Sequence, residues 1–371
     1  MFQILVVGAV VAFGVYIVNN TLDNLASRGI ASGFDFLSSE AGFGIIQSLI
    51  EYSEASSYGR AFWVGLLNTL LVSAIGIILA TILGFIIGVA RLSSNWLVAK
   101  MAAAYIETFR NIPLLLQLFF WYFAVLRALP SPRQSLVIGD SVFLNIRGFY
   151  TPRPVPEDGF WLIPAAIVAG VVAVLLLTRW AHRRQDETGQ PFHVVYVSAG
   201  ILIGLPVLAA AASGFPLSWD IPELRGFNFT GGMVLIPELM ALLLALSIYT
   251  ASFIAEIVRA GILAVSHGQT EAAYSLGLRP GPTLRLVVIP QAMRVIIPPL
   301  TSQFLNLTKN SSLAAAIAYP DLVSVFAGTV LNQTGQAIEV IAITMAVYLT
   351  VSLLISLFMN WYNKRMALVE R

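Results

Sequence analysis

The chain has 371 residues, of which 58% are hydrophobic and only 11% are charged, and its formal net charge is +2. Soluble domains carry about 25% charged residues, so a water-soluble globule of this composition could not cover its own surface. The small net charge argues against nucleic-acid binding. The chain has no cysteine, which excludes a disulfide scaffold, a thiolate zinc site and a cysteine nucleophile. Its histidines, His182, His193 and His267, fit no metal motif.

Apolar tracts of about 17–20 residues dominate the chain, and each is long enough to cross a bilayer as a helix. They predict an all-α polytopic membrane protein with about eight transmembrane helices. The tracts are Phe2–Val18, Phe62–Ala90, Leu97–Leu126, Phe160–Leu177, Val194–Ala212, Leu239–Val258, Val295–Tyr319 and Val340–Met359. We interpret the first tract as a retained helix, because no Lys or Arg precedes it and no small-x-small cleavage site follows it.

The distribution of Lys and Arg among the loops predicts the orientation of the chain in the membrane. With the amino terminus in the cytoplasm, the inner connections hold twelve basic residues and the outer connections hold seven. Both termini are therefore expected in the cytoplasm. The segments 19–61, 129–159 and 213–237 are then external, and the stretch 129–159 is proline-rich. The connection 260–294 is the longest one inside.

This inner connection carries the sharpest pattern, read from Gly261 as GILAVSHGQTEAAYSLGLRPGPTLRLVVIPQAMRVIIPP. We expect a short helix over Gln269–Leu276, because these residues are good helix formers and Gly277 supplies a stop. The run Pro280–Pro282 predicts a turn. A second amphipathic stretch, Thr283–Ile289, runs to a further proline.

The small residues Ala272 and Ala273 predict one flat face on the short helix, suited to close approach by another protein. Glu271 lies near the amino-terminal end of that helix, where a negative charge is favourable. Taken alone, the pattern would also fit an ordinary amphipathic connector at the level of the lipid headgroups.

The order of these residues resembles the EAA loop of ABC importer permeases, in which a short coupling helix docks in a groove of a cytoplasmic ATPase. The resemblance extends along some 30 residues. It implies an ATPase-coupling role for Gln269, Glu271, Ala272, Ala273, Gly277 and Pro290.

Three further stretches, Tyr105–Gln117, Ala255–Gly261 and Leu307–Leu313, are similar to permeases for polar amino acids. The resemblance implies a five-helix type I permease core, with an extra helix at the start and a helical hairpin, 160–212, inserted between core helices. This layout resembles the permeases of general L-amino acid importers, where two non-identical permease chains pair.

The expected division follows from that layout. It comprises an amino-terminal helix with an external polar segment (1–60), the first two core helices (61–128), the insertion of external loops and hairpin (129–237), and the remaining core with its coupling loop at about 260–294 (238–371).

A free amino acid presents a carboxylate and an ammonium group, and both must be matched when the molecule leaves water. Lys309 follows the helix-breaking pair Pro298–Pro299, and a cation at a broken helix can receive a carboxylate. The alternatives are that Lys309 extends to the interface or pairs with Glu256 or Glu339. The candidate substrate path comprises Lys309, Asn310, Ser311, Asn306, Gln117 and Thr250, whose uncharged members could equally be helix–helix contacts.

Glu107 and Arg110 are three residues apart and could pair on one helix face, as could Glu256 and Arg259. All four lie towards the cytoplasmic ends of their segments. We interpret them as structural pairs or as contacts with a partner permease rather than as substrate ligands.

The chain contains no GxxxxGK[ST] loop and is expected not to be an enzyme, so ATP and Mg²⁺ would be bound by a separate ATPase. The resemblance implies a bacterial inner-membrane permease that carries a broad range of polar L-amino acids. Its expected partners are a second homologous permease, two copies of the ATPase and a periplasmic amino-acid-binding protein. A permease of narrow specificity for glutamine, glutamate or basic amino acids is the nearest alternative, and homodimer and heterodimer both stay open.

Two other classes of protein fit less well. An ion-coupled secondary transporter would need a carboxylate deep in a core helix, and the span centres here are uncharged. An integral membrane enzyme would need a catalytic set, and His, Asp and Cys are scarce in the spans.

Overall fold

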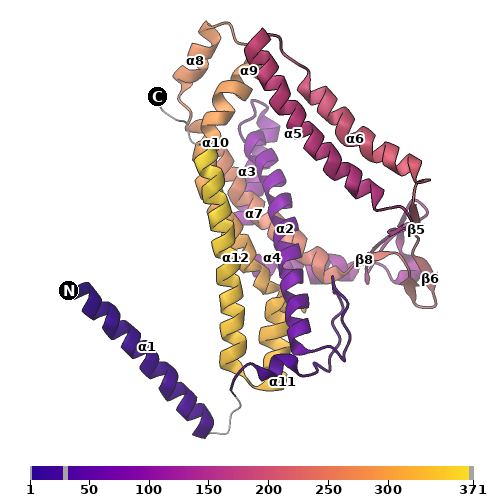
Figure 1. The fold of residues 1–371 in the computed structure, drawn as a ribbon, viewed down its shortest axis with the longest axis vertical. Coiled ribbons are helices and arrows are strands. Elements are labelled where there is room, and N and C mark those ends of the chain that lie inside the picture. The colour runs from indigo at the N-terminus through magenta and orange to yellow at the C-terminus, as the bar shows by residue number, and fades with distance from the viewer. Residues whose placement is uncertain (1, 28–31, 367–371) are drawn as a thin grey trace. The chain divides into compact units, whose positions relative to one another are not determined.

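The computed structural model of the chain describes residues 2–27 and 32–366, which are mostly helical (Figure 1). Among these residues, seven helices are long and apolar enough to cross a membrane. An eighth span results if α3 (Trp96–Asn111) and the helical segment Leu114–Ala128, bent by 105°, are counted as one. The helical, polytopic fold expected from the sequence is confirmed, and the insertion adds short strands to it.

The α-helices that follow the amino-terminal α1 (Phe2–Ser27) are interrupted in places by short 3₁₀ and π-helical segments. They are α2 (Tyr58–Ala90), α3 (Trp96–Asn111), α4 (Leu114–Phe119), α5 (Leu162–Thr188), α6 (Val194–Ala212), α7 (Pro237–Leu263), α8 (His267–Ser275), α9 (Pro280–Thr283), α10 (Ile289–Asn310), α11 (Leu331–Thr334) and α12 (Ala337–Met366).

The chain divides into two compact units, of which the first comprises residues 1–128 and 236–371 and the second residues 129–235. In the first unit α2 packs along α7, α7 packs on α10, and α10 packs on α12 (Figure 1). The core of this bundle is built from small and branched side chains on α2 and α7, including Ala80, Leu246 and Ile254.

Glycine allows the close approach of α2 and α7. A Cβ atom on Gly84 would lie 2.6 Å from the Cβ of Ile254, and one on Gly88 would lie 2.7 Å from the carbonyl oxygen of Ala255. Helices in lipid gain little from the hydrophobic effect, so small residues at their contacts permit the close packing that holds them together.

We expect Gly84→Val to destabilise the bundle by about 1–3 kcal/mol, because the added methyl groups overpack the contact with α7. The thermal midpoint of the purified chain in detergent measures this. The matched control is Gly204→Val on α6, where an added Cβ meets nothing within 4 Å. Equal midpoints for the two variants would contradict the packing argument.

The third apolar tract is broken at Pro113. Ile112 is extended (φ −97°, ψ 127°), as a residue before proline prefers to be, and α3 therefore ends at Asn111. The side-chain amide of Gln117 donates to the carbonyl oxygens of Phe109 and Ile112, both at 2.9 Å, and so satisfies acceptors that the break leaves free. The chain then changes direction by 105°.

A buried polar network fixes the loop that follows the 3₁₀ segment Ser311–Ile317. The amide of Asn68 donates to the carbonyl of Pro320 at 2.9 Å, and the hydroxyl of Thr69 accepts the N–H of Leu322 at 3.0 Å. Asp321 is fully buried, and its carboxylate accepts the N–H of Ser324 at 2.8 Å. These bonds tie the loop to α2 and replace the water that its backbone groups would otherwise need.

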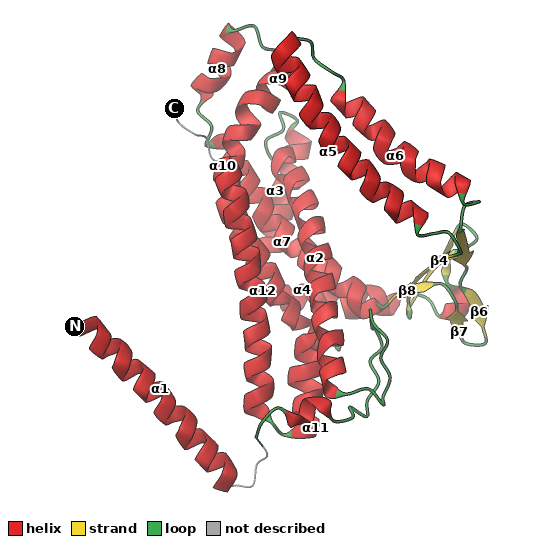
Figure 2. Cartoon of the chain, viewed as in Figure 1, coloured by secondary structure: helices red, strands yellow, loops and turns green. Residues whose placement is uncertain are grey.

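The second unit contains the helices α5 and α6 and all the named strands (Figure 2). The strands are β1 (Leu136–Ile138), β2 (Val142–Asn145), β3 (Gly148–Thr151), β4 (Arg153–Pro156), β5 (Leu217–Asp220), β6 (Glu223–Arg225), β7 (Asn228–Thr230) and β8 (Met233–Leu235). They form an antiparallel sheet in the order β1-β2-β3-β8 and the pairs β4-β5 and β6-β7.

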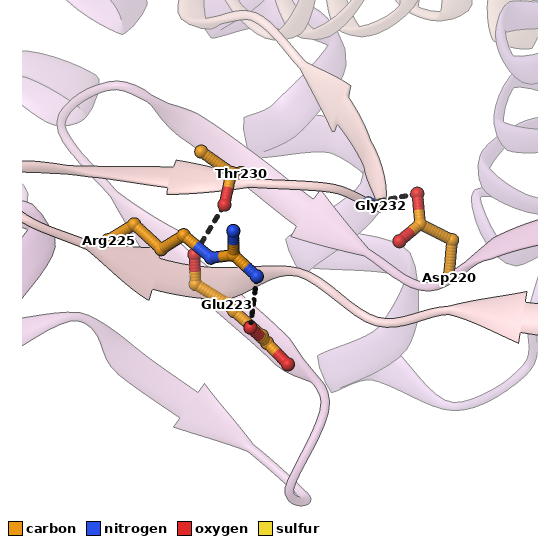
Figure 3. A network of polar contacts seen from close by, with 5 residues as sticks. All are labelled: Asp220, Glu223, Arg225, Thr230 and Gly232. Carbon is orange, nitrogen blue, oxygen red and sulfur yellow. Dashed lines mark hydrogen bonds and ion pairs between the residues drawn. The ribbon is translucent and has the colours of Figure 1, made fainter.

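The pairs β3-β8 and β4-β5 each join the segment before α5 to the segment after α6. The two segments therefore lie on the same side of any bilayer that α5 and α6 cross. The β6-β7 hairpin carries an exposed ion pair, Arg225 Nη2 to Glu223 Oε2 at 3.1 Å (Figure 3). Nearby, the Asp220 carboxylate accepts the N–H of Gly232 at 3.0 Å, which fixes the turn into β8.

Candidate functional site

The connection between α7 and α10 contains a short helix with a defined end. The helix expected over Gln269–Leu276 is α8. At its end, the N–H of Gly277 donates to the carbonyl of Tyr274 at 2.9 Å, and the N–H of Leu278 donates to the carbonyl of Ala273 at 3.1 Å. Gly277 has φ +78°, in the left-handed region. This is a Schellman end, in which the residue with positive φ is usually glycine.

Two polar residues of α8 have side-chain partners, one within α8 and one on α10. The carboxylate of Glu271 lies 3.0 Å from Nδ1 of His267, one turn earlier on an exposed surface. The amide of Gln291, in the first turn of α10, donates to Oε1 of Gln269 at 3.2 Å and links the two helices. Ala272 is exposed but Ala273 is buried. The flat face expected from both alanines therefore includes only Ala272, because Ala273 packs against the chain itself.

The prolines of this connection do not break the chain as expected. Pro280 opens α9, where its missing N–H costs nothing and its fixed φ suits a first helical turn. The helical run then continues through the π-helical segment Leu284–Val288 into α10. Pro290 sits within this run, since the wider π turn relieves the hydrogen bond that proline cannot donate. The turn expected at Pro280–Pro282 and the end expected at Pro290 were therefore wrong.

Two apolar side chains of this region were missed in the sequence. Leu276 is 83% exposed and Tyr274 is 49% exposed, on a helix end otherwise surrounded by polar residues. Exposed apolar side chains at a rigid helix end are a signal of contact with another surface, either protein or lipid. The run Tyr274–Gly277 contains this signal, but only the fold shows which of its residues point outwards.

The second candidate site is a cavity of about 440 Å³ on the first unit, lined by Lys309, Ser312, Tyr348 and Ser352 together with apolar side chains. Both expected partners of Lys309 are engaged elsewhere. The carboxylate of Glu256 bonds Arg259, and that of Glu339 accepts the N–H of Gly33 at 2.8 Å. Within residues 2–27 and 32–366 no ion pair involves Lys309.

The other expected substrate-path residues do not line this cavity. Asn306 is exposed and Asn310 is half-buried, whereas Ser311 is buried and donates to the carbonyl of Thr308 at 2.7 Å. Gln117 braces the bend after α3, and Thr250 is buried on α7. The structure therefore keeps Lys309 as an accessible cation and adds Ser312, Tyr348 and Ser352, which the sequence did not single out.

The charged residues of α3 and α7 gather around a third, polar cavity of about 270 Å³, lined by Arg91, Glu107, Arg110, Glu256 and Arg259. Glu256 and Arg259 pair as expected, and the side chain of each is 32% exposed. No ion pair joins Glu107 to Arg110 in the part of the chain that the structure describes. The pairing considered for these two residues is not formed, because Arg110 lies over the ring of Phe253 instead.

Over residues 76–368 the chain matches the family described as the binding-protein-dependent transport system inner membrane component. The match includes the core helices, the second unit and the α8 connection. The chain belongs to this family. It is accordingly a multi-pass component of an inner membrane, as the apolar helices require.

Several curated relatives of this inner membrane component match along its whole length. The chain is 62% identical to the putative amino-acid ABC transporter permease protein YhdX of Escherichia coli, covering 100% of this chain and 94% of that protein. It is 56% identical to the general L-amino acid transport system permease protein AapQ of Rhizobium johnstonii, over 100% of this chain and 92% of that protein. It is 46% identical to the glutamate/glutamine/aspartate/asparagine transport system permease protein BztB of Rhodobacter capsulatus, over 100% of this chain and 93% of that protein.

A solved structure shares the fold of this inner membrane component. The crystal structure of an amino acid ABC transporter with histidines aligns with a TM-score of 0.50, at 22% identity, over 83% of this chain and 95% of the other. At this identity the comparison supports the helical permease fold and nothing finer.

Proposed function

We propose that the chain is the membrane permease subunit of an ATP-driven ABC importer that moves amino acids into a bacterial cell. The observation that carries this proposal is the whole-length identity of 62% and 56% to permeases named for amino acids and for general L-amino acids. The name of the second relative supports transport of a broad range of L-amino acids by this chain. The name of the third relative keeps a narrower range, acidic amino acids and their amides, as the alternative.

The α8 connection supports coupling to a separate ATPase. Its exposed Leu276 and Tyr274 offer an apolar contact, and the Schellman end at Gly277 keeps the direction of that contact rigid relative to α8. The helical run from Pro280 continues into α10, and the hydrogen bond from Gln291 to Gln269 links α8 to this run, which leads to Lys309. ATP and Mg²⁺ are bound by the ATPase, and the coupling residues are Gln269, Glu271, Ala272, Gly277 and Leu276.

The proposed assembly contains this chain, a second permease, two ATPase subunits and a periplasmic amino-acid-binding protein. Both termini lie in the cytoplasm, on the side with the excess of Lys and Arg. The Lys309 cavity receives the substrate carboxylate. An exposed ammonium that forms no ion pair within the described residues attracts an anion, and the hydroxyl groups of Ser312 and Ser352 can hydrogen-bond either end of the substrate.

Purification of the full chain from its native membrane in mild detergent, followed by mass spectrometry, tests the assembly. We expect an ATPase and a second permease in the same complex. Reconstituted into vesicles containing ATP, the complex should accumulate L-amino acids only when binding protein is present outside. A lone chain that transports without nucleotide would overturn the proposal in favour of an ion-coupled transporter. Uptake restricted to glutamate, glutamine, aspartate and asparagine would establish the narrow alternative.

A further inference from the structure

The polar cavity of 270 Å³ lies where three helices meet in the first unit. Arg91 caps the carboxyl end of α2, Glu107 and Arg110 lie near the end of α3, and Glu256 and Arg259 lie on α7. The glycine contacts place the carboxyl end of α2 beside that of α7, which leads directly into α8. The cavity therefore opens at the coupling-loop end of the helix bundle, away from the Lys309 cavity, with which it shares no lining residue.

The charges around the cavity do not cancel among themselves. Arg259 Nε lies 3.0 and 3.2 Å from the two carboxylate oxygens of Glu256, so these two side chains neutralise one another. Within the described residues, Arg91, Arg110 and Glu107 take part in no ion pair. The cavity thus presents two free cations and one free anion to its interior.

Arg110 is oriented for use by a ligand. Its guanidinium carbon lies over the ring of Phe253, 5.3 Å from the ring centroid, which is a cation–π contact. A cation–π contact uses none of the N–H groups of the guanidinium as hydrogen-bond donors to a carboxylate, and these groups can match a carboxylate with two parallel hydrogen bonds. Glu107, three residues earlier on the same helix, is an acceptor for an ammonium group.

We propose that this cavity is a second binding site, for the zwitterionic end of a free α-amino acid. The carboxylate lies between Arg91 and Arg110, and the ammonium group lies against Glu107. The volume is below the range of about 300–1,000 Å³ typical of drug-sized ligands, which suits a small metabolite. The choice of an amino acid over other small zwitterions rests on the proposed function. Because the charged groups contact only the shared end of the molecule, the site does not select strongly among side chains.

The experiment uses the complete purified complex, without nucleotide or binding protein, and radiolabelled L-alanine as the probe. Equilibrium dialysis is performed on the unaltered complex and on a Lys309→Met complex, in which binding in the other cavity is weakened. We expect saturable binding in both. In the Lys309→Met complex, Arg110→Gln and Glu107→Gln should each weaken the binding of L-alanine at least tenfold, and Arg110→Lys should weaken this binding less. The control Lys100→Gln removes an exposed charge from the same helix and should leave binding unchanged.

Competition identifies the ligand chemistry. Propanoate lacks the ammonium group and isopropylamine lacks the carboxylate, so both should compete far more weakly than unlabelled L-alanine. Inorganic phosphate that competes as well as L-alanine would reveal a plain anion site and overturn the proposal. Binding that is absent, or that persists unchanged in Arg110→Gln and Glu107→Gln, overturns it as well. Loss of the second permease from the Arg110→Gln complex would assign the charges to subunit contact instead.

Uptake by the unaltered complex separates this inference from the proposed function. ATP-driven uptake together with no L-alanine binding in the polar cavity removes only the second site. Binding that depends on Arg110 and Glu107 in a complex that transports no amino acid supports the site and contradicts the importer.

Discussion

Gly277→Val is expected to reduce ATP-driven uptake at least tenfold while leaving membrane insertion intact. Gly277 has φ +78°, a conformation that costs a residue with a Cβ about 1–2 kcal/mol, and a β-branched residue more. The variant therefore loses the Schellman end of α8, and Leu276 no longer points in a fixed direction. Initial rates of uptake in proteoliposomes with internal ATP measure the effect. The uptake rate of Gly277→Ala should lie between that of Gly277→Val and that of the unaltered chain.

The matched control for this change lies in the same connection. An added Cβ meets nothing within 4 Å at either Gly277 or Gly281, and of these two only Gly277 has a positive φ. Gly281→Val therefore adds the same bulk without the backbone strain and should retain most of the uptake. If both valine variants transported equally well, the rigid end of α8 would have no part in coupling.

Lys309→Met should lower the affinity for transported amino acid by about ten- to a hundredfold, since a hydrogen bond to a charged group contributes about 1.5–3 kcal/mol. Methionine keeps most of the length of the side chain and removes its charge and its N–H donors. The measurement is the substrate concentration at half-maximal uptake, with saturating binding protein. Lys100→Met, which removes an exposed lysine outside the cavity, serves as the control. Unchanged affinity and rate in Lys309→Met would remove this residue from the substrate path.

Much of this protein is readable from its sequence, because a membrane imposes simple requirements on a chain. A span must be apolar over about 20 residues, and its backbone must be satisfied by its own helix. The tract Val194–Ala212 is α6 with the same bounds, and the break in the third tract appears at Pro113. The short helix before Gly277 is local as well, since its glycine and good helix formers act on their own neighbours.

Contacts between distant segments could not be read in this way. The insertion carries no span-like pattern outside its hairpin, and its strands are only three or four residues long, so their pairing depends on partners far away in the chain. Pro290 continues a helix because a π-helical segment precedes it. Ala273 is buried and Ala272 is exposed although they are adjacent and identical.

The sequence alone thus determined the membrane fold, the spans and the short helix in the connection between α7 and α10, which follow from hydropathy and from local backbone preferences. Only the tertiary structure decided which charges are free. Glu107 and Arg110 have the spacing of a pair, but Phe253 of α7 holds Arg110, and Arg91 of α2 joins them across the bundle. Spacing on one helix states which side chains can meet, whereas the neighbouring helices determine which of them do.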